Sequence, residues 1–129
     1  MRTMKIKKKK VKLNPHFLDY FADWDHFEYF LLGGYGSGKS FTTADKIINK
    51  CHSEVRKVLV IRDTFASHRD STYEDLVSAI DHLHLGDHFT YTKSPLKITC
   101  DNGSVILFRG LDDVKKIKSI KDISIIWIN

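Results

Sequence analysis

The segment YFLLGGYGSGKS, residues 29–40, sets four apolar residues directly before a glycine-rich stretch that ends in lysine and serine. The stretch has the spacing of the phosphate-binding P-loop: a glycine, four residues, then glycine, lysine and a hydroxyl residue. Glycine backbones adopt positive φ angles and bring N–H groups close to phosphate oxygens, where a Cβ would intrude. The pattern therefore predicts a strand, a nucleotide-binding loop and a helix. The alternative interpretation is a Gly/Ser-rich surface loop.

Each residue type in the predicted loop has a chemical role. Lys39 is expected to reach the β and γ phosphates, and the Ser40 hydroxyl is expected to hold Mg²⁺. Ser40 also opens the following helix, whose N-terminus favours negative charge. The predicted nucleotide-binding residues are Gly33, Gly34, Tyr35, Gly36, Ser37, Gly38, Lys39, Ser40 and Phe41.

Length and composition bound the class of protein. A chain of 129 residues is one domain or part of one, and it is long enough to bury a core. It has no apolar run of membrane-spanning length and no signal-peptide pattern at its lysine-rich start. We therefore expect an intracellular protein that is not secreted and has no membrane partner. Cys51 and Cys100, outside any CxxC spacing, are predicted to be buried thiols.

Positive charge is concentrated at the start of the chain. Seven of the 21 basic residues fall within the first twelve positions, where there is no acid, so 14 basic and 16 acidic residues remain in the body. Residues 1–13 are therefore predicted to be a basic, flexible arm. The arm either attracts nucleic acid through its charge or is simply solvated. Its basic residues are Arg2, Lys5, Lys7, Lys8, Lys9, Lys10 and Lys12.

Periodicity in the first half of the chain indicates alternating helices and strands. Phe17, Tyr20, Phe21 and Trp24 share one face of a short helix, which packs on the core or lends a ring to stack on a nucleotide base. A longer helix is predicted after Ser40, with Phe41, Ala44, Ile47, Ile48 and Cys51 on one face. Residues 57–62 (KVLVIR) form a continuous apolar run typical of a strand buried in a parallel sheet. The fold class is therefore α/β.

The second half adds a helix and a hairpin. Ser71 and Glu74 match a capping box, which predicts a helix that ends near Gly86. Residues 97–100 and 104–109 are extended by pattern, and the Asn-Gly pair between them predicts a hairpin turn.

A final apolar run, residues 123–128 (ISIIWI), is predicted to be another buried strand. A polar, lysine-rich loop or short helix at 112–121 precedes it. P-loop enzymes place a carboxylate at the tip of such a strand to hold Mg²⁺. Here the tip is Asn129, whose amide carries no negative charge, so the predicted metal site lacks its acid.

Several other polar residues are weaker candidates. Arg62, at the end of its strand, is expected either to contact phosphate or to pair with Asp63 or Glu74. Arg69, Arg109 and Lys118 are minor candidates for anion contact. The cluster Asp81, His82, His84, Asp87 and His88 straddles a helix end and is interpreted as a polar surface turn rather than a metal site.

Taken together, these blocks resemble the N-terminal part of phage terminase large subunits of the PBSX type. The resemblance rests on LNPHF, LLGGYGSGKS, IRDT, RDSTYEDL, DNGSVILFRGLDD, KIKSIKDIS and IIWIN, in that order. Such proteins join an ATPase domain to an RNase H-like nuclease domain and act with a small terminase subunit and a portal. They hydrolyse ATP with Mg²⁺ to package and cut double-stranded viral DNA in the host cytoplasm.

The resemblance implies that residues 33–40 are the Walker A loop and residues 123–128 the Walker B strand. Two positions depart from the family pattern: Tyr35 stands where many relatives have arginine, and Asn129 stands where they continue into paired acids. We expect residues 14–129 to form a partial P-loop NTPase domain, a mostly parallel sheet flanked by helices with a hairpin insertion. The nuclease domain is expected to be absent.

A chain of this kind is expected to be inactive alone unless a second chain or further copies complete it. The alternatives are a non-catalytic remnant that binds DNA through the basic arm, or a different P-loop NTPase such as a helicase or a small-molecule kinase.

Overall fold

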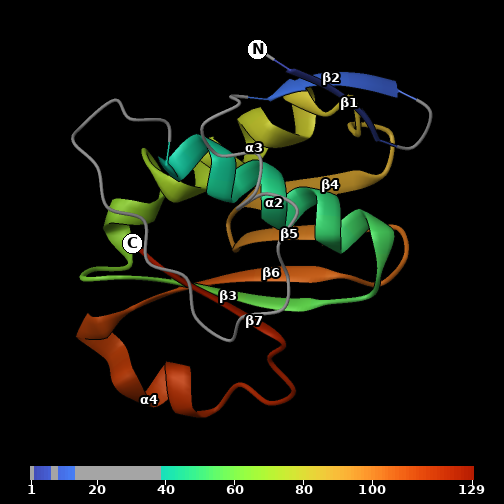
Figure 1. Ribbon diagram of the computed structural model, residues 1–129. Coiled ribbons are helices and arrows are strands. Elements are labelled where there is room, and N and C mark those ends of the chain that lie inside the picture. Colours follow the sequence, from blue (N-terminus) through green and yellow to red (C-terminus); the bar gives the residue numbers. More distant parts are fainter. Residues whose placement is uncertain (1, 7–8, 14–38) are drawn as a thin grey trace.

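The structure, a computed structural model, describes residues 2–6, 9–13 and 39–129 (Figure 1). The predicted helix at 17–24, the strand at 29–32 and the loop at 33–38 lie outside the described residues. The elements are β1 (Arg2–Ile6), β2 (Lys9–Leu13), α2 (Lys39–Ser53), β3 (Lys57–Arg62), a 3-10 turn (Ala66–His68), α3 (Thr72–His82), β4 (Phe89–Lys93), β5 (Leu96–Cys100), β6 (Val105–Gly110), a second 3-10 turn (Leu111–Asp113), α4 (Val114–Lys118) and β7 (Ile125–Ile128).

Among the described residues, five strands form one mixed sheet in the order β4-β5-β6-β3-β7. β3 is parallel to β6 and to β7, whereas β4–β5 and β5–β6 are antiparallel. The predicted α/β class is confirmed, but the expectation of a mostly parallel sheet is wrong. The predicted hairpin is present as β5 and β6. It is not an insertion, because β6 pairs directly with β3 and so belongs to the middle of the sheet.

Strand β4 was not predicted. Its sequence, FTYTK, has one buried residue followed by four exposed ones, so it carries no apolar run that could have marked it. It pairs with β5 across a short turn at Ser94 and Pro95, and this pairing extends the antiparallel side of the sheet by one strand.

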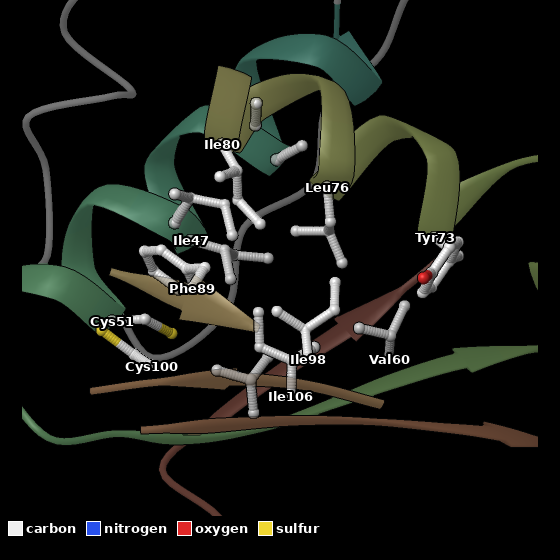
Figure 2. Close-up of a cluster of buried hydrophobic side chains, with 14 of the residues drawn as sticks. Ile47, Cys51, Val60, Tyr73, Leu76, Ile80, Phe89, Ile98, Cys100 and Ile106 are labelled. Carbon is white, nitrogen blue, oxygen red and sulfur yellow. The ribbon is translucent and has the colours of Figure 1, made fainter. Parts of the chain in front are cut away.

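Helices α2 and α3 cover one face of the sheet, and the core lies between the two layers (Figure 2). Val58 and Val60 of β3 are completely buried there, which confirms the predicted burial of this strand. The predicted thiols are also confirmed, since Cys51 and Cys100 are buried and unbridged. Burial raises the pKa of Cys51 to about 12, so it remains a thiol at neutral pH.

Strand β7 confirms a strand within the last apolar run, over residues 125–128, and the structure shows that it pairs with β3. The expectation of burial on both faces is wrong. Trp127 is 9% exposed beneath the helices, whereas Ile126 and Ile128, on the other face, are 57% and 73% exposed. Successive side chains alternate between the faces of a sheet, and only the helix-side face is covered along β7.

Helix α3 begins at Thr72, directly after Ser71, as predicted, but the capping box does not form. The Ser71 hydroxyl donates to the carbonyl oxygen of Ser67 at 2.6 Å and makes no bond to the helix start. The helix ends at His82, and His84 takes a left-handed φ of 58°, so the chain turns before Gly86. In the described part of the chain, no helix is long and apolar enough to cross a bilayer.

The basic segment at the start of the chain contains backbone pairing that the sequence analysis did not predict. Within the expected flexible arm, β1 and β2 pair antiparallel, from Arg2 opposite Leu13 to Ile6 opposite Lys9 (Figure 1). We call this two-stranded element the basic ribbon, residues 2–6 and 9–13.

A buried carboxylate links α2 to α3. Asp45 of α2 is 1% exposed, and its Oδ2 lies 2.8 Å from Nδ1 of His82 on α3. Oδ1 of Asp45 is buried and has no hydrogen-bond partner among the described residues. Burial raises the pKa of Asp45 to about 6, although the neighbouring His82 acts in the opposite direction. The ionised carboxylate is therefore an unfavourable feature of the folded state at neutral pH.

We predict that Asp45→Asn increases stability at pH 7 and removes part of its pH dependence. A carboxyl whose pKa is higher in the folded state binds its proton more tightly there, so lowering the pH from 7 to 5 stabilises the wild type through this group. The asparagine cannot take up that proton. Urea unfolding at both pH values measures the change, and Asp81→Asn, at an exposed site on α3, is the control. Parallel pH profiles for Asp45→Asn and wild type would contradict the prediction.

Candidate nucleotide site at the carboxyl edge of the sheet

Three parallel strands end together at one edge of the sheet. Arg62 is opposite Gly110, and Ile61 is opposite Ile128. The ladder continues one residue further, because the Asn129 N–H donates to the Ile61 carbonyl oxygen at 3.0 Å. Figure 1 shows the start of α2 on the same side of the molecule as these strand ends. Ligands of open α/β sheets bind outside this edge, so the topology brings Arg62, Asn129 and the start of α2 to one region.

The N-terminus of α2 has the composition of an anion site. Lys39 and Ser40 are its first two residues, and its first turn contains no acid. A helix N-terminus carries a partial positive charge and unsatisfied N–H groups, both of which favour a bound anion. Phe41 follows, 45% exposed, with its ring centroid 4.9 Å from that of His82. Phe41 was predicted to share a helix face with four apolar residues that are buried, but its own side chain is exposed.

The glycines and neighbours of the predicted loop lie outside the described residues, so their predicted contacts stay predictions. These residues are Gly33, Gly34, Tyr35, Gly36, Ser37 and Gly38. The helix predicted to follow them is present and begins at Lys39. After this helix the chain enters β3, which lies between β6 and β7 in the sheet.

Arg62 forms no ion pair within residues 40–129. Among the described residues no ion pair joins it to Asp63 or Glu74, the two partners considered from sequence. Asp63 Oδ1 accepts from the Thr64 N–H at 2.9 Å, and Glu74 lies 3.9 Å from Lys93 Nζ. The Arg62 Nε atom is buried and makes no hydrogen bond within the described part of the chain. Its positive charge lowers the pKa of Asp75 against the larger raising effect of burial.

The donors at this edge suit an anion better than an isolated metal ion. Ser40 and Asn129 offer neutral oxygens, whereas Mg²⁺ in proteins is held by one or two carboxylates together with substrate phosphates. Within residues 40–129, where side chains are described, no three His, Cys, Asp or Glu residues are grouped to hold a metal. A phosphate-bound Mg²⁺ would thus meet one protein hydroxyl, that of Ser40, and the amide of Asn129.

His68 braces this edge, and the sequence analysis did not select it. The residue is completely buried. Its Nε2 lies 2.7 Å from the Arg109 carbonyl oxygen, and its Nδ1 lies 2.6 Å from the Thr72 hydroxyl. Because a carbonyl only accepts, Nε2 carries the proton and Nδ1 accepts from Thr72. Burial, helped by the charge of Arg62, lowers the pKa of His68 and keeps the ring neutral.

Gly110 allows the loop after β3 to cross the end of β6. A Cβ at this position would collide with the backbone of Thr64 and Phe65 and with the Asp112 carboxylate. The Phe65 N–H donates to that carboxylate at 3.2 Å. Close packing here and the His68 bonds together tie residues 63–72 to the end of β6.

Of the other predicted polar residues, one lies at the carboxyl edge of the sheet and the rest lie elsewhere. Arg109 joins the carboxyl edge, with one guanidinium nitrogen 2.7 Å from the Phe108 carbonyl oxygen and a buried, unbonded Nε. Arg69 instead donates to the Lys93 carbonyl oxygen at 3.2 Å, and Lys118 is exposed at the end of α4. The histidine cluster is separated into pairs: His82 contacts Asp45, and His88 Nδ1 lies 2.7 Å from Asp101.

We predict that His68→Ala destabilises the fold by about 2–4 kcal/mol, because it leaves a cavity and two buried polar atoms unpaired. Thr72→Val removes only one of the two bonds and should lose about 1–2 kcal/mol. Urea unfolding measures both values, with the exposed Ser78→Ala on α3 as the control. A His68→Ala variant as stable as the control would show that the brace is not structural.

Comparisons with known proteins agree on one family. Residues 25–129 match the model of the phage terminase large subunit family. Over 117 residues, covering 91% of this chain, the sequence is 46% identical to the PBSX phage terminase large subunit of Bacillus subtilis (strain 168). Over 121 residues, covering 88% of this chain, it is 42% identical to the terminase large subunit of Bacillus phage SPP1.

The chain spans 27% and 29% of the length of these two relatives, so the matched region is a minor part of each. The match nevertheless includes the predicted P-loop, the carboxyl edge of the sheet and strand β7. The chain belongs to the phage terminase large subunit family.

Proposed function

We propose that this chain is an ATP-binding part of a terminase large subunit, the ATP-driven motor that packages double-stranded viral DNA. The observation that carries the proposal is the meeting of three features at one edge. The helix that begins at Lys39 starts there, and the parallel strands β3, β6 and β7 end there. Arg62 lies at the same edge, with a buried Nε that has no hydrogen-bond partner among the described residues. Residues 33–40 would wrap the phosphates, as in other P-loop proteins.

Each residue of this edge has a proposed task. Lys39 and the N–H groups of the first turn of α2 would hold the β and γ phosphates, and Ser40 would bind the accompanying Mg²⁺. Arg62 would contact a phosphate oxygen through its guanidinium group. Bound ATP with Mg²⁺ supplies a phosphoryl group for transfer to water. The protein's part is positioning and charge stabilisation.

The proposal separates binding from turnover. Asn129 would stand where a carboxylate normally supports the Mg²⁺, and an amide supplies no charge. Loss of such an acid removes several kcal/mol of transition-state stabilisation, and each 1.36 kcal/mol is about tenfold in rate. We propose that the 129-residue chain binds ATP but hydrolyses it very slowly on its own.

The partners proposed for the chain follow from the family. They are viral DNA, a small terminase subunit and a portal, in the cytoplasm of the bacterial host. A second function, a non-catalytic DNA-binding module, is favoured by one observation of its own, the basic ribbon at residues 2–13.

Lys39→Ala is expected to weaken ATP binding by about 10- to 100-fold, since a hydrogen bond to a charged group contributes about 1.5–3 kcal/mol. Titration of a fluorescent ATP analogue into the pure chain with Mg²⁺ measures the affinity. Lys97→Ala on β5 removes an exposed lysine on the antiparallel side of the sheet and is the matched control. Equal affinities for the two variants would sink the nucleotide proposal. Steady phosphate release that Lys39→Ala abolishes would contradict the proposed lack of turnover.

A further inference from the structure

The basic ribbon sorts its residues onto two chemically different faces. In an antiparallel pair, directly opposed residues share a face, and successive residues alternate. The register therefore places Thr3 opposite Lys12 and Lys5 opposite Lys10 on one face. The other face holds the three remaining pairs, Arg2 with Leu13, Met4 with Val11 and Ile6 with Lys9.

The first of these faces contains no apolar residue and no acid. We call it the lysine face: Thr3, Lys5, Lys10 and Lys12. All four apolar residues of the ribbon occupy the opposite face, together with Arg2 and Lys9, so the strand pairing leaves one face with lysines and no apolar residue. A solvated, unpaired arm would make no such separation, because its residues would have no fixed neighbours.

The lysine face is unfavourable by itself. Lys5 and Lys10 are directly opposed, and like charges in opposed positions destabilise a sheet. Lys12 lies two residues from Lys10 on the same face, which adds a third positive charge, and residues 2–13 contain no acid to balance them. A bound polyanion would remove this repulsion. The face therefore lacks a countercharge that a ligand can supply.

We propose that the lysine face of the basic ribbon contacts the phosphate backbone of double-stranded DNA. Residues two apart on a strand are about 6.8 Å apart, so Lys10 and Lys12 are spaced closely enough to meet the dense row of phosphates on a duplex. Two-stranded ribbons are an established element for contact with DNA grooves. The choice of DNA as the partner rests on the packaging function proposed above, whereas the requirement for a polyanion rests on the ribbon alone.

The test compares two triple variants of the full chain that lose the same charge from the same segment. The first variant removes the three positive charges of the lysine face: Lys5→Gln/Lys10→Gln/Lys12→Gln. The second variant, the control, removes two charges between the strands and one on the opposite face: Lys7→Gln/Lys8→Gln/Lys9→Gln. Each lowers the formal net charge from +5 to +2. Fluorescence anisotropy with a random-sequence DNA duplex, titrated at several KCl concentrations, gives the affinity and its salt dependence.

The lysine-face variant should bind the duplex at least about tenfold more weakly. Its plot of log affinity against log KCl should also be about three units less steep, because each lost phosphate contact reduces the slope by about 0.9. The control should change the slope by about one unit at most. A third variant, Val11→Pro, keeps every charge but interrupts β2, and it should also bind more weakly.

Three results would overturn the proposal: equal losses in the two triple variants, unchanged binding by Val11→Pro, or preferential binding to phosphatidylserine vesicles over DNA. ATP affinity measured on the same proteins keeps this inference distinct from the proposed nucleotide site. A chain that binds no ATP but shows face-dependent DNA binding retains the ribbon and refutes the nucleotide site. If the chain binds ATP and the two triple variants lose the same DNA affinity, the nucleotide site is retained and the ribbon proposal is refuted.

Discussion

Parallel hydrogen bonding on both sides of β3 is the constraint on which the candidate site depends. Because β6 and β7 both run in the direction of β3, all three strands deliver their carboxyl ends to a single edge. The chain arrives at β3 directly from α2, so the start of that helix comes to the same side. Reversing any one of these strands would carry Arg62, Gly110 or Asn129 to the opposite end of the sheet.

The edge is also held in shape by contacts between segments far apart in the chain. His68 reaches the carbonyl of Arg109, and Phe65 reaches the Asp112 carboxylate, so the loop after β3 is fastened to the end of β6 at two points. Arg62 ends β3 directly before this fastened loop, and its charge acts on His68 in the loop and on Asp75 of α3. A rigid surround matters for a charged group, because preorganised donors bind an anion without first having to rearrange.

The predictable features of the fold were those encoded by neighbouring residues. The run KVLVIR indicated β3 to the residue, and Asn102-Gly103 marked the turn between β5 and β6. Features that depend on distant partners were not visible. β4 is recognisable only by its pairing with β5, and His68 acquires its role from a carbonyl 41 positions away. The capping box at Ser71 did not form: the hydroxyl donates to the Ser67 carbonyl oxygen, and its oxygen accepts no N–H from the start of the helix. For the site, the sequence indicated Lys39, Ser40, Arg62 and Asn129, but not the brace that positions their surroundings.

Strand β7 has a practical consequence for handling the protein. Its outward isoleucines, Ile126 and Ile128, lie on the last strand of the described sheet, which pairs there on one side only. Both side chains are already largely exposed, so replacing either with a polar residue removes little buried apolar area. Ile128, the more exposed of the two, is therefore the position on β7 at which a charged residue should cost the fold least.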